Sequence, residues 1–396
     1  MTTISTLEAH GVPVAAHGGL LETKIMVYGI DQLRSLFDLA LDEQDREAHY
    51  HALFDGIAAP QEAGAQLVQR ITAHVIGNAE LSAQDRAAAA PIFPLTVHVS
   101  ASAAPLIVSS PYDLSTPYGS PRIASFTDVI MEQGGYFVCT STPLTFTCDT
   151  LTRNGTTGST FSDFNILGRT GATPPPPPMP GGAWQASGGY NGECTSAGVA
   201  GHGGGPGNRG NGGQQGGDGA PGYPGTPSME ARITIQRALH VQDGQLTIYT
   251  RSGNGGEGGP GGQGGPGQQG GNGGNGVTCG CTGNAGGQGG DGGDGGRGGR
   301  GGDGGNGVDA AANVLVRVPS GADVDRVAGI RESAPPGRPG APGPGGPPGG
   351  GGWGGSGGKG NGDGGGGGSG SWGSLGPQGN PGTREGTAAQ INRMAL

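Results

Sequence analysis

Two cysteines separated by a single glycine, Cys279 and Cys281, are the residues of this chain best placed to do chemistry. Thiolates at this spacing could bind a soft metal ion, but a structural zinc site takes four ligands, and no second pair follows. The other chemistry open to them is a disulfide. Since the chain has five cysteines, at least one thiol remains unpaired within a monomer. We predict no metal site and no cofactor, and we predict that Cys139 and Cys148 are buried free thiols.

The nearest phosphate-binding motif, Gly-Gly-Lys at residues 357–359, is incomplete. Trp353 stands where the first glycine of a phosphate loop belongs, and Gly360 stands where Ser or Thr should follow the lysine. Arg297 and Arg300 each precede two glycines, which resembles an RNA-binding Arg-Gly-Gly box. The formal net charge of the chain is −10, however, and this argues against nucleic acid as a partner.

Acid–base and metal chemistry are equally poorly supported. His49 and His51 follow an acidic stretch that is typical of a solvated helix face. Asp291 and Asp294 would lie about 9 Å apart in a three-residue repeat, which is too far for them to share one cation. No serine or cysteine nucleophile has a recognisable base partner in the sequence. We therefore predict that the protein is not an enzyme.

Glycine tracts dominate the second half of the chain, which has 94 glycines and 31 prolines among its 396 residues. Between residues 253 and 308, variable residues recur at every third position in two arms of eight triplets. All residues between them are glycine except Gln268 and a short break at 277–283. Two equal arms around a break predict a hairpin. Less regular tracts at 171–230 and 334–384 predict two more.

A period of three residues matches neither an α-helix nor a β-strand. It fits the left-handed threefold helix of polyproline II, in which eight triplets would span about 75 Å. Such a helix makes no internal backbone hydrogen bonds, so bare glycine edges would let neighbouring arms approach and bond. The triplets resemble those of snow-flea-type antifreeze proteins and of the glycine-rich adhesins of phage tail fibres. That resemblance implies a bundle of polyglycine II helices, and disorder of the tracts is the alternative.

Outside the tracts, the apolar pattern changes along the chain. Residues 1–92 have helical periodicity, with helices predicted from Ile30 to Leu41, from Gln61 to Ile76 and from Ala83 to Ala90. The apolar stripe of the first helix comprises Leu33, Leu36, Phe37, Leu39, Ala40 and Leu41. From Pro94 the period becomes two. The predicted strands cover residues 95–99, 106–108, 136–139, 144–148, 164–167, 232–235, 245–249 and 314–318.

Together these patterns predict a mixed fold. It would have a small N-terminal helical segment, a short-strand β base that is solenoid- or sandwich-like, and a bundle of left-handed polyglycine II helices arranged as three hairpins. The predicted boundaries are 1–92 for a helical attachment or oligomerisation segment, 93–170 for the β-rich base, 171–230, 253–308 and 334–384 for the hairpins, 231–252 and 309–333 for the β blocks between them, and 385–396 for a C-terminal tail.

The turns of the three hairpins would meet at one tip. The candidate binding residues there are Trp184, Tyr190, Asn191, Cys279, Cys281, Trp353, Lys359, Asn361 and Trp372. Exposed aromatic side chains are typical of contact sites, although tryptophans that cover the edges of a bundle would satisfy the same pattern. A disulfide from Cys194, on the first turn, to Cys279 or Cys281 would staple two hairpins together. Free, exposed thiols are the alternative.

The leading hypothesis is a non-enzymatic adhesion, receptor-binding or assembly protein that presents this tip to a cell-surface glycan or protein receptor. One alternative is a structural subunit that self-associates into a filament or extracellular coat. Another is an ice-binding protein, although threonine is scarce at the variable positions. We expect a homo-oligomer at an extracellular, virion or cell surface. No signal peptide or membrane span is recognisable, and a cytoplasmic location stays open.

Overall fold

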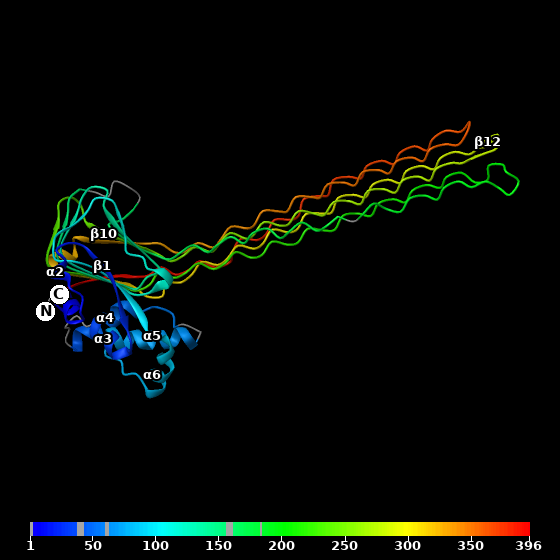
Figure 1. Ribbon diagram of the computed structural model, residues 1–396. Helices are drawn as coiled ribbons and strands as arrows, with labels where there is room; N and C mark the ends of the chain where they lie inside the picture. Colours follow the sequence, from blue (N-terminus) through cyan, green and yellow to red (C-terminus); the bar gives the residue numbers. More distant parts are fainter. Residues whose placement is uncertain (1–2, 38–42, 60–62, 156–160, 183) are drawn as a thin grey trace.

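The computed structural model describes residues 3–37, 43–59, 63–155, 161–182 and 184–396. A base of two β-sheets and a helical layer carries a long glycine-rich stalk (Figure 1). The predictions made for Leu39, Ala40 and Leu41 in the first helix, and for Gln61 at the start of the second, fall outside the described residues.

Most helices of the base come from the N-terminal part of the chain. They are α1 (Thr3–Ala9), α2 (Val14–His17), α3 (Ile30–Phe37), α4 (Glu43–Phe54), α5 (Ala63–Ile76) and α6 (Ala83–Ala89), followed by the 3-10 turn η1 (Ala90–Ile92). Helix α3 buries Leu33, Leu36 and Phe37, as its apolar stripe predicts. The side chain of Ser82 caps α6 by accepting a hydrogen bond from the amide of Asp85 at 3.0 Å.

Two sheets form the rest of the base. The first comprises β1 (Leu21–Val27), β2 (Leu95–Ser102), β5 (Arg122–Met131), β7 (Leu144–Arg153), β9 (Ala231–Val241), β13 (Val314–Val318) and β15 (Ile391–Ala395) in that order, and β3 (Leu106–Val108) also pairs with β5. The second comprises β14 (Val327–Arg331), β10 (Leu246–Arg251), β8 (Phe164–Leu167), β6 (Tyr136–Thr140) and β4 (Pro111–Asp113). Every described pair of these strands is parallel except β1 with β2.

From β4 onwards the chain alternates between the two sheets, so each circuit adds one strand to each. The circuits stack in register, because Leu144 pairs with Ala231, Ala231 with Val314, and Val314 with Ile391. Three fully buried phenylalanines lie between the sheets, Phe137, Phe146 and Phe164, with ring centroids 4.8 to 5.1 Å apart. The base is therefore a parallel solenoid around an aromatic and aliphatic core.

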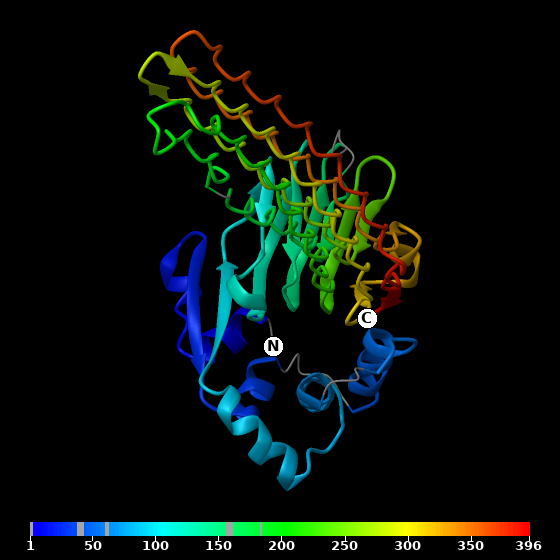
Figure 2. The ribbon, with the colours of Figure 1, turned by 90° about the vertical axis from the view of Figure 1, so that its right-hand side faces the viewer.

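The N-terminal helices cover the other face of the larger sheet. A second hydrophobic cluster joins Leu33 and Ile71 of the helices to Val97, Ile123 and Leu315 of β2, β5 and β13. In Figure 2 the blue N-terminal helices lie to one side of the strands, and the arms of the stalk, green to red, run together. The first 92 residues thus pack on the solenoid and supply β1 to its sheet.

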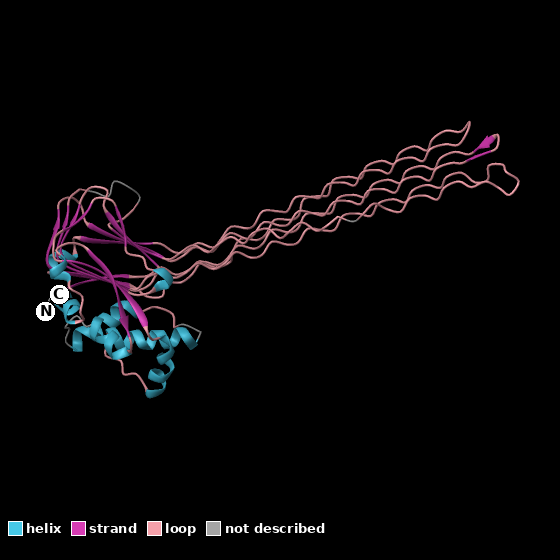
Figure 3. Ribbon diagram, in the orientation of Figure 1, coloured by secondary structure: helices cyan, strands magenta, loops and turns pink. Residues whose placement is uncertain are grey.

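The predicted fold class is wrong, and so is its description as a polyglycine II or collagen-like bundle. The molecule is a mixed α/β protein organised by an eight-stranded, mainly parallel sheet. Among the residues that the structure describes, the glycine tracts contain no helix, and their strands are β11 (Thr278–Cys279) and β12 (Thr282–Gly283) at the tip (Figure 3). The three-residue period locates glycine but carries no information about long parallel strands such as β5, which the sequence analysis missed. The sequence analysis also missed β1 and β15, because polar residues in both strands hide the alternation of apolar and polar positions.

The stalk consists of six extended arms from the three tracts. Outbound arms are arm 1 (168–182 and 184–190), arm 3 (253–276) and arm 5 (334–358), and return arms are arm 2 (203–227), arm 4 (284–308) and arm 6 (362–386). Each outbound arm follows a strand of the smaller sheet, β8, β10 or β14. Each return arm leads into a strand of the larger sheet, β9, β13 or β15. The three hairpins are therefore long insertions at the same corner of three successive circuits.

Backbone hydrogen bonds recur at every third residue along the arms. Arm 3 donates to arm 5 from Gly255 and to arm 2 from Gly256, for example, and it accepts from arm 4 and arm 1. Arm 4 similarly bonds with arms 2, 3, 5 and 6. Arms 1 and 6 each bond with two arms only, which places them at opposite edges of two staggered rows, 1-3-5 and 2-4-6.

Glycine is required wherever arms meet. A Cβ atom on Gly296 would lie 1.8 Å from the carbonyl oxygen of Gln214, and one on Gly290 would lie 2.1 Å from that of Asn208. These distances are far below any van der Waals contact, so the arms could not approach each other with side chains between them. Gly350 and Gly365 differ, because a Cβ on either would meet nothing within 4 Å.

This contrast predicts the effect of alanine at the two kinds of position. Gly296→Ala should force arms 2 and 4 apart and destabilise the stalk by about 1–3 kcal/mol. Gly365→Ala is the matched control and should be neutral or slightly stabilising, because alanine restricts the unfolded chain. Hydrogen exchange of the arm amides measures both. Equal protection of the arm amides from exchange in the two variants would contradict the close backbone contact between arms 2 and 4 at Gly296.

Candidate functional site at the stalk tip

The turns of the three hairpins meet at the far end of the stalk (Figure 1). Turn 1 covers 191–202, turn 2 covers 277–283 and contains the β11–β12 hairpin, and turn 3 covers 359–361. Each turn has a glycine with a positive φ angle: Gly198 at 72°, Gly280 at 60° and Gly360 at 78°. Since other residues rarely adopt this conformation, these glycines fix the turns locally.

Hydrogen bonds hold the turns side by side, with turn 2 in the middle. The Ala200 amide donates to Thr282 Oγ1 at 2.9 Å and joins turn 1 to turn 2. On the other side, the Lys359 amide donates to Thr278 Oγ1 at 2.9 Å. Asn361 Nδ2 donates to the carbonyl oxygen of Gly283 at 2.7 Å. The predicted tip residue Asn361 therefore links turns 2 and 3 through its side chain.

A disulfide between Cys194 and Cys279 joins turn 1 to turn 2, with Cα atoms 5.7 Å apart. Cys279 is buried, whereas Cys281 is an exposed free thiol. Cys139 and Cys148 are free thiols inside the solenoid core, where burial raises the pKa of both well above the ordinary value. Their thiolate forms are therefore disfavoured, and neither is suited to nucleophilic chemistry.

The structure separates the predicted tip residues into two groups. Tyr190 adjoins turn 1 and Asn191 is its first residue; the Asn191 side chain accepts a hydrogen bond from the Asn275 amide at 2.9 Å. Trp184, Trp353 and Trp372 lie back along arms 1, 5 and 6, at 93%, 75% and 70% exposure. The side chains of these three tryptophans are therefore largely solvated.

The tip also has a small charged and aromatic cluster. The His202 and Tyr190 rings meet edge to face at 5.2 Å, and His202 Nε2 lies 3.7 Å from Glu193 Oε2. The Tyr190 ring occupies the space that a side chain at position 205 would need. Lys359 lies on turn 3 and is exposed. Turn 1 thus presents aromatic and acidic groups and turn 3 a basic group at the same end of the stalk, which the glycine repeat itself cannot provide.

The aspartates of arm 4 have a role that sequence reasoning missed. Asp303 forms an ion pair with Arg300 at 2.5 Å. The main contacts of these aspartates, however, are to backbone amides of arm 6: Asp291 accepts from Gly368 at 2.8 Å, Asp294 from Ser371 at 2.7 Å and Asp303 from Asn380 at 2.8 Å. The sequence pattern that could have predicted these contacts is the recurrence, at three-residue spacing, of short side chains that accept hydrogen bonds.

Asparagine does the same between arms 3 and 5. Asn272 Oδ1 accepts from the Trp353 amide and Asn275 Oδ1 from the Ser356 amide, each at 3.0 Å. These side chains thereby accept hydrogen bonds from backbone amides that, among the described residues, have no backbone carbonyl partner on a neighbouring arm. At Asp303, the hydrogen bond from Asn380 and the ion pair with Arg300 hold the carboxyl pKa below its ordinary value.

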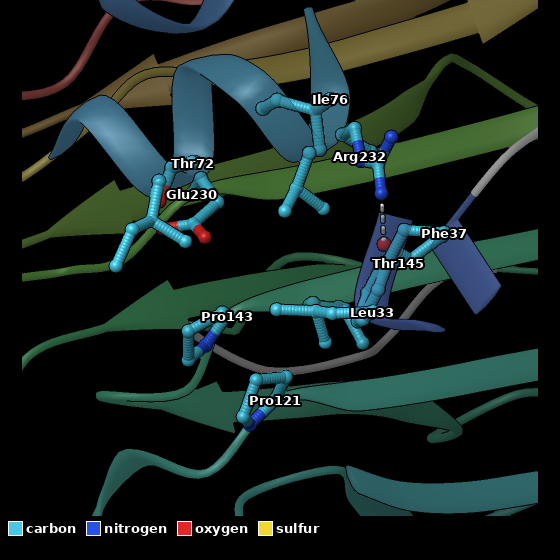
Figure 4. Close-up of a pocket in the computed structure, with 12 residues that line it drawn as sticks. Leu33, Phe37, Thr72, Ile76, Pro121, Pro143, Thr145, Glu230 and Arg232 are labelled. Atoms are coloured by element: carbon cyan, nitrogen blue, oxygen red, sulfur yellow. Dashed lines mark hydrogen bonds between the residues drawn. The ribbon is translucent and has the colours of Figure 1, made fainter. Parts of the chain in front are cut away.

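The base contains a small cavity. A cavity of about 80 Å³ lies between the helices and the larger sheet, with Leu33, Phe37 and Ile76 among its lining residues (Figure 4). Arg232 donates to Thr145 Oγ1 at 2.8 Å, and burial lowers its pKa to about 10. Since ligand pockets usually measure about 300–1,000 Å³, this cavity is too small for an ordinary substrate.

His49 corrects a further expectation. It was placed on a solvated helix face, but it is 1% exposed on α4, whereas His51 on the same helix is exposed. Burial and the positive charges of Arg317, Arg232 and Arg46 lower the pKa of His49 to about 3. The imidazole is therefore neutral and packs as part of the helical layer. Among the described residues, no cluster of metal-ligating side chains occurs.

Comparison with protein-family models, curated proteins and solved structures finds no match to this chain. In the part of the chain that the structure describes, none of the helices has the length and apolar character needed to span a bilayer.

Removing the disulfide should loosen the tip. It closes a loop with a sequence separation of 85, for which the chain-entropy model gives a stabilisation of about 4–5 kcal/mol. Cys194→Ser combined with Cys279→Ser should therefore lower the free energy of unfolding and increase amide exchange in turns 1 and 2. Cys281→Ser is the control and should change neither, because that thiol is unpaired.

The contact between Asp303 and Asn380 should weaken in acid. Because the pKa of folded Asp303 is lowered, its contribution to stability is present above the unfolded pKa of about 4 and is lost as the pH falls through the folded value. The NMR shift of the Asn380 amide should follow this titration. In Asp303→Asn, which keeps an acceptor oxygen but cannot titrate, the shift should not depend on pH. A titration that persists in the variant would rule out Asp303 as its source.

Proposed function

We propose that the protein is a non-enzymatic adhesion or receptor-binding protein whose stalk presents the three turns to a partner. The observation that carries the proposal is the convergence of all three turns at one end, joined by a disulfide and by side-chain hydrogen bonds. Elsewhere along the stalk the same triplet chemistry repeats. The tip is where a varied set of side chains is held in one arrangement.

The construction of the stalk supports this role. Every third residue of the inner arms bonds to a neighbouring arm, so bending the stalk would break many backbone hydrogen bonds at once. An arrangement of this kind holds its end in a fixed orientation, which reduces the entropy lost when a partner binds. A Cys194–Cys279 disulfide suits an oxidising environment, so we propose a location outside the cell or at a virion or cell surface.

The exposed groups at the tip define the chemistry of the proposed partner. Tyr190 offers an aromatic face, Val199 an apolar contact and Lys359 a positive charge. An aromatic ring that can stack on a sugar, beside charged groups that can bind hydroxyls or carboxylates, suits an acidic glycan of a cell surface. A protein receptor with an acidic patch presents similar chemistry.

A glycan array of neutral and acidic oligosaccharides, probed with the labelled full chain, tests the proposal. We expect binding to acidic glycans that falls by about tenfold or more when Tyr190 and Lys359 are both replaced by alanine. Ile107→Ala is the control, because Ile107 is exposed on β3 in the base. A glycan signal that survives the tip variant but is lost in the control would place recognition in the base.

Absence of glycan binding would move the search to protein receptors, tested by binding of the labelled chain to protease-treated and untreated cells. Loss of cell binding after protease treatment, together with the same dependence on Tyr190 and Lys359, would keep the tip as the binding site. Cell binding that is indifferent to both tip substitutions would overturn the proposal.

A further inference from the structure

One edge of the stalk, formed by arm 6, is built differently from the other. Arm 6 bonds to arms 4 and 5 only, and its outer backbone positions recur at Ser369, Trp372, Leu375 and Gln378. Among the described residues, these four make no backbone-to-backbone hydrogen bond with another arm. Arg297 Nε donates to the Leu375 carbonyl oxygen at 3.5 Å. The other N–H and C=O groups of these four residues form a row of backbone donors and acceptors, at three-residue spacing, without a partner among the described residues.

Arm 6 also has glycines that the internal packing does not require. Of the five consecutive glycines at 364–368, a Cβ on Gly364 or Gly367 would lie within 2.0 Å of a backbone oxygen of arm 4. A Cβ on Gly365 would meet nothing within 4 Å, and those on Gly366 and Gly368 would make only ordinary contacts at 3.5 Å. The fold therefore explains two of these glycines, and the other three keep a bare backbone surface.

The opposite edge, formed by arm 1, is rich in proline over part of its length. It carries five consecutive prolines at 174–178 and another at Pro180, none of which has an N–H group. Proline on an outer edge is a common device against unwanted pairing. Arm 6 has two prolines, Pro377 and Pro381, both in the half nearer the base. The two edges therefore differ in composition: arm 1 has six prolines between residues 174 and 180, whereas arm 6 has the run of five glycines.

Two large apolar side chains occupy successive outer positions of the arm 6 edge. Trp372 is 70% exposed and Leu375 is 65% exposed, so their apolar surface is solvated in the isolated chain. Burial of such surface against a partner is favourable, and tryptophan often dominates the energy of an interface.

We propose that arm 6 is an interface for a second copy of this chain, which places its own arm 6 alongside. The spacing of the unpaired backbone groups indicates which kind of chain can bind along this edge. The hydrogen-bonding groups of a β-strand repeat every two residues, so they do not stay in register with groups that repeat every three residues. A glycine-triplet arm stays in register, as every arm-to-arm contact inside the stalk demonstrates. Because Trp372 and Leu375 lie on arm 6 of each copy, two arm 6 edges bury apolar surface against each other, and the contact forms a closed dimer through identical surfaces. This proposal does not depend on the proposed function of the tip.

Sedimentation velocity of the full chain across a concentration series tests the interface. The wild type should shift from monomer to dimer as concentration rises. Gly365→Arg combined with Leu375→Arg should raise the dimer dissociation constant by about tenfold or more, because both put charge and bulk on the bare edge. Met179→Arg is the matched control on the proline-bearing edge, where Met179 is 50% exposed, and it should leave the dimer unchanged.

Thermal unfolding of each variant separates loss of association from loss of fold, and Gly365→Arg should fold normally because its Cβ meets no neighbour. A cross-link then identifies the surface: in a Cys281→Ser background, Ser369→Cys should give a covalent dimer on mild oxidation, whereas Met179→Cys should not. A wild type that stays monomeric at all concentrations, a dimer unaffected by the double substitution, or cross-linking through position 179 alone would each overturn the proposal.

Discussion

The stalk depends on direct contact between backbones, which is possible only where no Cβ lies between them. At position 296, for example, an added Cβ would lie 1.8 Å from a carbonyl oxygen of arm 2. Ordering glycine costs up to about 1 kcal/mol more than ordering alanine, and an interarm hydrogen bond contributes about 0.5–1.5 kcal/mol. The two magnitudes are similar, so an arm is stable only when most of its triplets are bonded. Arms 3 and 4, which contact four arms each, meet this condition most fully.

The solenoid supplies the alignment that glycine triplets lack. Parallel strands lie about 4.8 Å apart, and the hairpins leave from the same corner of three successive circuits, so neighbouring arms start at bonding distance and in register. The bond from Gly168 to Arg251 lies at the point where the pairing of β8 with β10 becomes the pairing of arm 1 with arm 3. In the base, phenylalanine and aliphatic side chains keep the two sheets apart. Along the stalk, glycine lets the two rows touch.

Polar side chains at the variable positions complete this arrangement. Asp291, Asp294 and Asn272 accept hydrogen bonds from amides of neighbouring arms that would otherwise face water alone. Their sequence spacing was evident, but the amide that each one reaches belongs to an arm 77 or 81 residues away. At the tip, the same separation in sequence explains why Cys194 had two possible partners before the structure placed it beside Cys279.

The sequence by itself determined the local features: the three glycine tracts and their central breaks, helices α3, α5 and α6, and many of the strands, because each of these leaves a periodic pattern within a few residues. Only the tertiary structure decided that the strands form two parallel sheets, that β1 and β15 complete the larger one, that His49 is buried, and which arms are neighbours. These depend on contacts between residues far apart in the chain. A glycine triplet matches any other triplet equally well, so its partner is set by the circuit of the solenoid from which it emerges.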